Sequence, residues 1–138
     1  MPVSYGTVFA LNILDRVENS REFLNALIGL LEPGGRLVVA LPLPYCAKPW
    51  VAGGGQSAAT SAEAADWAAA NALPSVPGGD WEESALMVGQ ALRSGGLRVE
   101  KVARAPYMCT GFEKGDEGGE LLYVLDAAIF VCTACQIE

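Results

Sequence analysis

The sequence contains no histidine, and none of its apolar runs approaches the roughly 18 residues that are needed to span a bilayer. The missing histidines exclude Ser-His-Asp and Cys-His catalysis and histidine-based metal sites. Any proton chemistry must therefore fall to Asp, Glu, Tyr, Lys or Cys. The start Met1-Pro2-Val3-Ser4 has neither a basic segment nor a long apolar core, so no signal peptide is predicted. We expect a soluble, globular chain.

Basic residues are also few. Nine Lys and Arg stand against 16 Asp and Glu, and the net charge is −7. This balance argues against binding a nucleic-acid backbone, which needs clustered Lys and Arg. An acidic chain is compatible with a basic or histidine-rich peptide partner, although many enzymes that act on neutral ligands are equally acidic.

The four cysteines do not form a metal-site pattern. Only Cys132 and Cys135 make a C-x-x-C, and a zinc site would have to recruit Cys46 and Cys109 from distant loops. A redox C-x-x-C normally opens a helix after a strand, whereas this one stands at the end of the sequence. We interpret the cysteines as small apolar residues in a reduced interior. No metal is predicted, and no role is assigned to Cys132 or Cys135.

The first 42 residues predict a βαβ unit. YGTVFAL (5–11) reads as a buried strand, and RLVVALP (36–42) reads as a second one. Between them, Asn19 followed by Glu22 is typical of a capping box, and Glu32-Pro33-Gly34-Gly35 is a helix stop. A βαβ unit favours parallel strands with a right-handed crossover. The helix has apolar residues at helical spacing: Phe23, Leu24, Leu27, Ile28, Leu30 and Leu31.

The rest of the chain predicts an insertion, a helix and two strands. Residues 52–77 are rich in Ala, Ser and Gly and predict a flexible insertion, partly helical from Glu63 to Ala70. Asp80 with Glu83 is a second capping box, and its helix is expected to run to about Arg93. Strands are predicted over 97–104 and from about 122 to 132. Because a loop joins them, with no helix between, they are expected to pair antiparallel.

The resulting fold class is α/β. The order β-α-β-α-β-β is that of the second half of a Rossmann-like, seven-stranded methyltransferase sheet, in which the last strand is antiparallel. The sequence has no segment corresponding to the first half of such a sheet. We therefore expect residues 1–138 to be the C-terminal part of a single methyltransferase domain, interrupted by the insertion at about 52–77.

Five segments follow one another along the chain: FALNILDR (9–16), LPLPY (41–45), GGDWEESA (78–85), RAPYMCTG (104–111) and LLYVLDAAIFV (121–131). Together they resemble the methyltransferase-like protein 9 family, also called DREV. The resemblance implies S-adenosylmethionine-dependent methyl transfer to the π nitrogen of histidine in His-x-His-type protein sequences. The implied partner is then a protein or peptide containing His-x-His.

The resemblance also implies three catalytic residues. Asp15 would accept one ring N–H of the substrate imidazole, which fixes the tautomer and leaves the other nitrogen free to attack the sulfonium methyl. Asn12 would orient the imidazole or the methyl donor, and is the one cofactor-binding residue expected. Tyr123 could complete the imidazole contacts. Asn12 and Asp15 follow a predicted strand at the end where ligands bind in open α/β sheets.

Each of these residues also has a purely structural interpretation. Asp15 could form only an ion pair or a turn with Arg16, and Asn12 could simply close the turn after the strand. Tyr123 could be a core aromatic residue with one satisfied hydroxyl. Asp126 is interpreted as structural, a partner for Arg16 or Arg104.

The sequence departs from the family in lacking the glycine-rich strand–turn–helix and the acidic residue that hold most of the methyl donor. We therefore expect a fragment whose first strand is an unpaired, apolar edge, and which alone is inactive. Any targeting segment would lie upstream of Met1, so no compartment is predicted. The alternative is a non-catalytic remnant that binds a peptide or protein partner. A small-molecule methyltransferase is less favoured.

Overall fold

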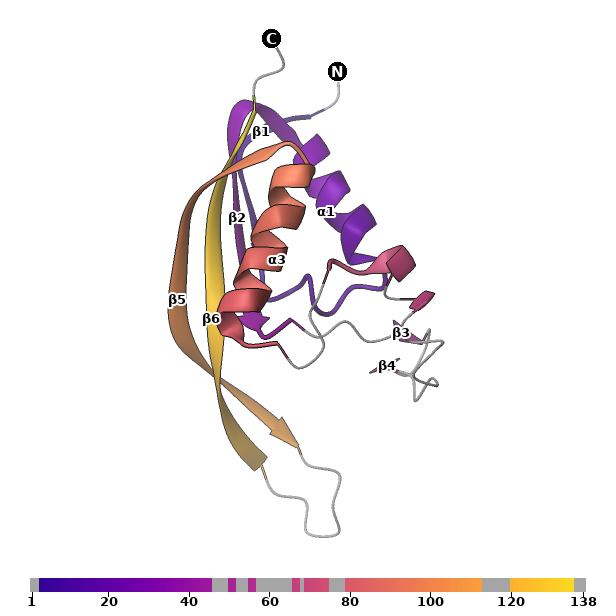
Figure 1. Cartoon of the computed structure of the whole chain (residues 1–138), viewed down its shortest axis with the longest axis vertical. Coiled ribbons are helices and arrows are strands. Elements are labelled where there is room, and N and C mark those ends of the chain that lie inside the picture. The colour runs from indigo at the N-terminus through magenta and orange to yellow at the C-terminus, as the bar shows by residue number, and fades with distance from the viewer. Residues whose placement is uncertain are drawn as a thin grey trace.

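The computed structural model describes residues 3–45, 50–51, 55–56, 66–67, 69–74, 79–112 and 120–135 (Figure 1). Two longer helices and four longer strands make up the body of the fold. The elements are β1 (Tyr5–Leu11), α1 (Ser20–Gly29), β2 (Leu31–Leu43), β3 (Trp50–Val51), β4 (Gly55–Gln56), α3 (Trp81–Ser94), β5 (Leu97–Phe112) and β6 (Glu120–Ala134).

The main sheet has four strands in the order β1-β2-β6-β5. β1 and β2 are parallel, and β6 lies antiparallel to both of its neighbours. The predicted antiparallel pairing of the last two strands is therefore confirmed, as is the α/β class. Because β6 reverses direction between them, β5 runs parallel to β1 and β2. The carboxyl ends of β1, β2 and β5 consequently share one edge of the sheet.

Both helices cover the same face of this sheet (Figure 1). Val39 of β2 lies opposite Phe130 of β6, and both side chains are fully buried. Leu24 of α1 and Val88 of α3 belong to the same buried cluster. The core therefore lies between the two helices and one face of the sheet.

β1 forms one edge of the sheet, as the sequence predicts. In the part of the chain that the structure describes, β2 is its only neighbour. Phe9 is 64% exposed, and Val3, Tyr5 and Leu11 are also exposed. An apolar edge strand of this kind is a template for pairing with another chain.

The boundary between α1 and β2 differs from the prediction. Asn19 caps α1, since its Oδ1 accepts a hydrogen bond of 2.9 Å from the Glu22 backbone N–H. The helix then ends at Gly29, and Leu31 belongs to β2 although it fits the helical spacing. The reason is tertiary: Tyr5 pairs with Leu31 and donates its N–H to the Leu30 carbonyl at 2.8 Å.

The Pro-Gly-Gly stop consequently lies inside the paired segment, where the register of the two strands shifts. Gly34 has a φ of 77°, a conformation that glycine adopts without strain. A Cβ on Gly35 would lie 2.8 Å from the Glu32 carbonyl oxygen. These two glycines therefore shape an irregular entry to β2 and do not end the helix.

The second capping box is confirmed. Asp80 Oδ1 accepts from the Glu83 N–H at 2.8 Å, and Glu83 Oε2 accepts from the Asp80 N–H at 3.2 Å. α3 then runs from Trp81 to Ser94, one residue past the expected end.

The last two strands are longer than predicted, so the predicted loop around Pro106 and Gly111 is wrong. Both residues lie in β5 and pair with β6, Pro106 with Asp126 and Gly111 with Leu121. β5 is an edge strand, where a proline costs no ladder hydrogen bond if its nitrogen faces outward.

Most of the insertion at 52–77 lies outside the described residues, so its flexibility stays a prediction. Residues 66–67 and 69–71 are helical, which agrees with the prediction over the part of 63–70 that is described. Among the helices of the described ranges, none is long and apolar enough to cross a membrane.

Candidate functional site

A tight turn follows β1 at the carboxyl edge of the sheet. The Asn12 N–H donates to the Ala40 carbonyl at 2.7 Å, and the Arg16 N–H donates to the Ile13 carbonyl at 2.9 Å. Asn12 has a φ of 52°, a left-handed conformation that asparagine tolerates better than most residues. Leu14 is 1% exposed and fixes the turn to the core. The buried leucine thus places Asp15 beside the sheet edge.

The Asp15 carboxylate is largely enclosed, with 19% of its side chain exposed. Its Oδ1 is buried and has no hydrogen-bond partner among the described residues. Its Oδ2 lies 3.9 Å from Nε of the exposed Arg16, which is too long for a hydrogen bond. Buried carboxylate oxygens are ordinarily paired. Asp15 therefore keeps one unsatisfied acceptor, Oδ1, which a ligand N–H could reach only if the atoms that cover it move aside. The long contact between Oδ2 and Arg16 does not satisfy Oδ1.

The other two predicted site residues are less constrained. The Asn12 side chain is exposed on the same turn, three residues before Asp15. Tyr123 lies in β6 opposite Cys109, beyond the point where β2 ends against Asp126. The side chain of Tyr123 lies outside the described part of the chain. The structure thus brings Asn12 and Asp15 onto one turn, and a contact between Tyr123 and a substrate stays a prediction.

Asp126 has a structural partner, as expected. Its Oδ2 accepts from Arg104 Nη2 at 2.6 Å and from Arg104 Nε at 3.2 Å. Arg104 also lies 3.2 Å from a carboxylate oxygen of Glu82, and its guanidinium lies 4.9 Å above the Trp81 ring. The hydrogen bond with Asp126 raises the pKa of Arg104. This cluster joins the start of α3 to β5 and β6.

Sequence reasoning missed a buried polar network at the exit of β2. Tyr45 Oη lies 2.9 Å from Ser20 Oγ, and the Tyr45 N–H donates to Ser84 Oγ at 2.7 Å. The Leu73 N–H donates to Ser20 Oγ at 3.3 Å. Ser20 and Ser84 are both almost fully buried. The network ties β2 to the first turns of α1 and α3. The tyrosine that ends LPLPY was the available signal.

A hollow of about 730 Å³ lies at the start of α1, a few residues after Asp15. Its walls include the carboxylates of Glu18 and Glu22 and the rings of Phe23 and Trp67. Carboxylates next to aromatic rings suit a cationic side chain, which both groups attract. The hollow is open to solvent, and its lining contains no Lys or Arg.

The described cysteines show no sign of a shared site. Burial raises the pKa of the Cys132 thiol to about 11, whereas Cys135 is exposed. Within the described ranges, no group of His, Cys, Asp and Glu side chains is arranged to hold a metal ion.

The sequence profile of the DREV methyltransferase family matches residues 1–134. The chain belongs to the DREV methyltransferase family. No curated protein is significantly similar to it.

Of three similar solved structures, the one with a TM-score above 0.5 supports a methyltransferase-like fold. A protein from Bacillus halodurans described as a methyltransferase is similar with a TM-score of 0.52 and 9% identity, over 99% of this chain and 74% of that chain. A methyltransferase from Methanosarcina mazei, described as S-adenosylmethionine-dependent, gives a TM-score of 0.47 and 8% identity, over 99% and 62%. The N-methyltransferase NodS from Bradyrhizobium japonicum, bound to S-adenosyl-L-homocysteine, gives 0.42 and 14%, over 97% and 48%. The DREV chain thus spans 48% to 74% of the lengths of these proteins.

The described residues fit the methyl acceptor better than the methyl donor. Asn12 and Asp15 supply one amide and one carboxylate at the carboxyl edge of the sheet. The described glycines with positive φ are Gly34, near the start of β2, and Gly96, just before β5, and both therefore lie at the opposite edge. No glycine-rich turn of the described chain faces the site. The described residues therefore do not form a binding site for S-adenosylmethionine.

Proposed function

We propose that this DREV methyltransferase takes part in S-adenosylmethionine-dependent methyl transfer to the π nitrogen of histidine in His-x-His-type protein sequences. One observation carries the proposal: the buried, unpartnered Oδ1 of Asp15 on the turn after β1. An imidazole has one N–H donor and one lone pair. A carboxylate that accepts the N–H fixes which nitrogen keeps the lone pair.

The roles of the two turn residues follow from their exposure. Asp15 is mostly enclosed, so that a hydrogen bond to its Oδ1 is protected from competing water. Asn12 is exposed, so its amide is accessible to the ring or to the methyl donor. S-adenosylmethionine supplies the sulfonium methyl group when it is bound. The contribution of this chain is to hold the imidazole in one tautomer and one orientation, which is a positioning effect.

Charge supports a basic polypeptide as the methyl acceptor. The chain carries a net charge of −7, and Glu18 and Glu22 line the hollow beside the Asp15 turn. A cationic side chain that flanks the target histidine would gain from both.

The experiment is a transfer assay with methyl-labelled S-adenosylmethionine and a lysine-flanked peptide containing His-Ala-His. It uses the chain as given and the chain joined to the glycine-rich strand–helix unit of another family member. We expect label on the π nitrogen, identified by mass spectrometry of the hydrolysed peptide, and none with Ala-Ala-Ala. Label on a small-molecule acceptor, with none on any histidine peptide, would overturn the proposal.

The same Asp15 acceptor also fits a second candidate function, peptide binding without transfer. In that case the joined protein transfers no label, while the chain still binds the His-Ala-His peptide through Asp15. Binding measured by fluorescence anisotropy separates the two functions, because it does not depend on the methyl donor.

A further inference from the structure

The last two strands extend beyond the rest of the sheet. Residues 126–133 of β6 lie between β2 and β5, whereas Glu120–Leu125 pair with β5 alone among the described residues. We call Tyr107–Phe112 together with Glu120–Leu125 the arm. Six residues of strand extend about 20 Å. Figure 1 shows the arm projecting past the N-terminal end of α3.

The arm exposes three large apolar side chains on one of its faces. Met108 is 69% exposed, Leu122 63% and Val124 66%. Met108 lies directly opposite Val124. Leu122 is two residues from Val124, which places it on the same face of the hairpin. Clustered apolar residues that project from a domain mark interaction sites more often than scattered ones do.

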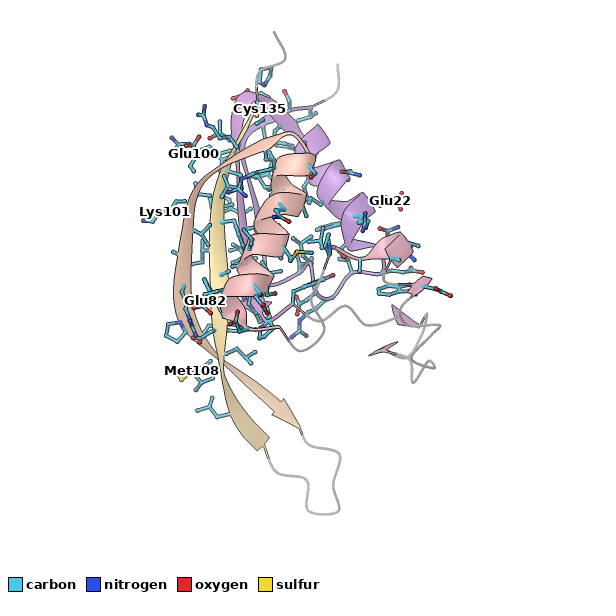
Figure 2. The ribbon with its side chains drawn as sticks, viewed as in Figure 1. Glu22, Glu82, Glu100, Lys101, Met108 and Cys135 are labelled. Carbon is cyan, nitrogen blue, oxygen red and sulfur yellow. The ribbon has the colours of Figure 1, made fainter. Side chains whose placement is uncertain are left out.

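The position of the arm connects it with the candidate site. β5 runs parallel to β1, so the arm leaves the sheet at the edge where β1 leads into Asn12 and Asp15. In the view of Figure 2, Met108 lies below Glu82, which stands at the start of α3. The edge of β6 that β2 occupies in the sheet is unoccupied by described residues over Glu120–Leu125. Strand edges of this kind accept an extended peptide through main-chain hydrogen bonds.

The negative charge of the chain distinguishes between two possible occupants of the arm, a second copy of the chain and a basic polypeptide. The sequence joining the two strands of the arm, EKGDEGG (113–119), has three acidic residues and one lysine, and Glu120 follows it. The whole chain is also acidic, so a second copy would bring like charges together. A basic polypeptide would bring opposite charges together, which favours encounter and binding.

We propose that the arm docks an extended, basic segment of the methyl-accepting polypeptide, which pairs with the free edge of β6 and packs on Met108, Leu122 and Val124. This inference rests on the proposed function, since it takes a polypeptide as the acceptor. The arm would hold the segment that flanks the histidine, while Asp15 holds the imidazole. Docking outside the site then contributes affinity without touching the reacting atoms.

The test is anisotropy of a fluorescein-labelled, 15-residue peptide with a central His-Ala-His and two lysines on each side, titrated with the full 138-residue chain. The arm variant is Leu122→Lys with Val124→Lys. We expect it to weaken binding by about tenfold or more, which corresponds to 1.4 kcal/mol. Leu86→Lys on α3 is the matched control, because Leu86 is 58% exposed and lies outside the arm. It should leave the affinity unchanged.

The double variant adds positive charge, so a neutral variant is needed too. Leu122→Ser with Val124→Ser should weaken binding as well, whereas a purely electrostatic effect would leave it unchanged and overturn the apolar contact. Circular dichroism and the melting temperature confirm that each variant folds. If a neutral variant melts early, Met108→Ser alone serves instead.

Strand pairing has its own readout. Successive N–H groups of an extended peptide point to opposite sides of the strand. A peptide with N-methyl groups at alternate backbone nitrogens therefore loses the N–H donors on one side and keeps those on the other. We expect one of the two alternating registers to lose binding and the other to keep it. Equal binding of both registers would overturn docking on the β6 edge.

Failure of the docking and failure of the proposed function give different results. An unchanged affinity of the arm variants, together with methyl transfer to the peptide, overturns the docking alone. Loss of binding in the arm variants, without transfer by any form of the enzyme, supports the docking and counts against the function. A wild-type dimer that Leu122→Lys separates, with unchanged peptide affinity, would assign the arm to a second copy and overturn the proposal.

Discussion

The hydroxyl of Tyr45 lies 2.9 Å from Oγ of Ser20, and both side chains are buried. Tyr45 follows the end of β2, and Ser20 is the first residue of α1. This hydrogen bond therefore joins the exit of one strand to the start of the helix that precedes it in sequence. The turn that carries Asn12 and Asp15 leads into that same helix.

Removing the hydroxyl should destabilise the fold. We expect Tyr45→Phe to lower the free energy of unfolding by about 1 kcal/mol, the net value of a typical buried hydrogen bond. For a domain of this size that corresponds to a fall of about 4 °C in the melting temperature. Tyr5→Phe is the matched control, since Tyr5 is exposed at the sheet edge. Equal melting temperatures for Tyr45→Phe and the wild type would contradict a stabilising role of the network.

Asp15→Asn separates function from stability. The change keeps the shape of the side chain but removes a buried carboxylate oxygen that has no partner. We expect the free energy of unfolding to stay within about 0.5 kcal/mol of the wild type. Methyl transfer by the joined protein should fall roughly 100-fold, which is about 2.7 kcal/mol of transition-state stabilisation. Unchanged turnover on the His-Ala-His peptide would refute the assigned role.

Cys132 should make stability depend on alkaline pH. Burial raises the pKa of its thiol from the ordinary 9.0 to about 11, so the folded state keeps a proton that the unfolded state releases. Its contribution is complete below pH 9 and is lost as the pH rises from about 9 to about 11. Urea unfolding at several pH values measures this. Cys132→Val, which cannot titrate, should show a shallower decline over that range.

The exposed edge of β1 should govern solubility. Phe9→Lys places a charge on an apolar edge strand, which is how natural proteins block edge-to-edge pairing. We expect less light scattering on concentration, with little change in the melting temperature because Phe9 is 64% exposed. Leu86→Lys adds the same charge on a helix and should reduce scattering less. An equal reduction would attribute the effect to net charge and not to the edge.

Local signals in the sequence predicted the elements of this fold. Asn19 and Asp80 cap their helices because a side-chain acceptor needs only the N–H groups of the next turn. The lack of a helix between the last two strands was enough to predict their antiparallel pairing. Asn12 and Asp15 are only three positions apart in one family segment, so the sequence was enough to predict that they lie on one turn.

Only the tertiary structure decided the rest, because those features depend on pairing between distant segments. Leu31 fits a helix by spacing but joins β2 because Tyr5 lies beside it. Pro106 and Gly111 read as loop residues but extend β5 because β6 runs opposite them. The unpartnered Asp15 oxygen, the Ser20–Tyr45 hydrogen bond and the exposed face of the arm follow from how the sheet and helices pack. The composition of the sequence and the spacing of its residues do not specify that packing.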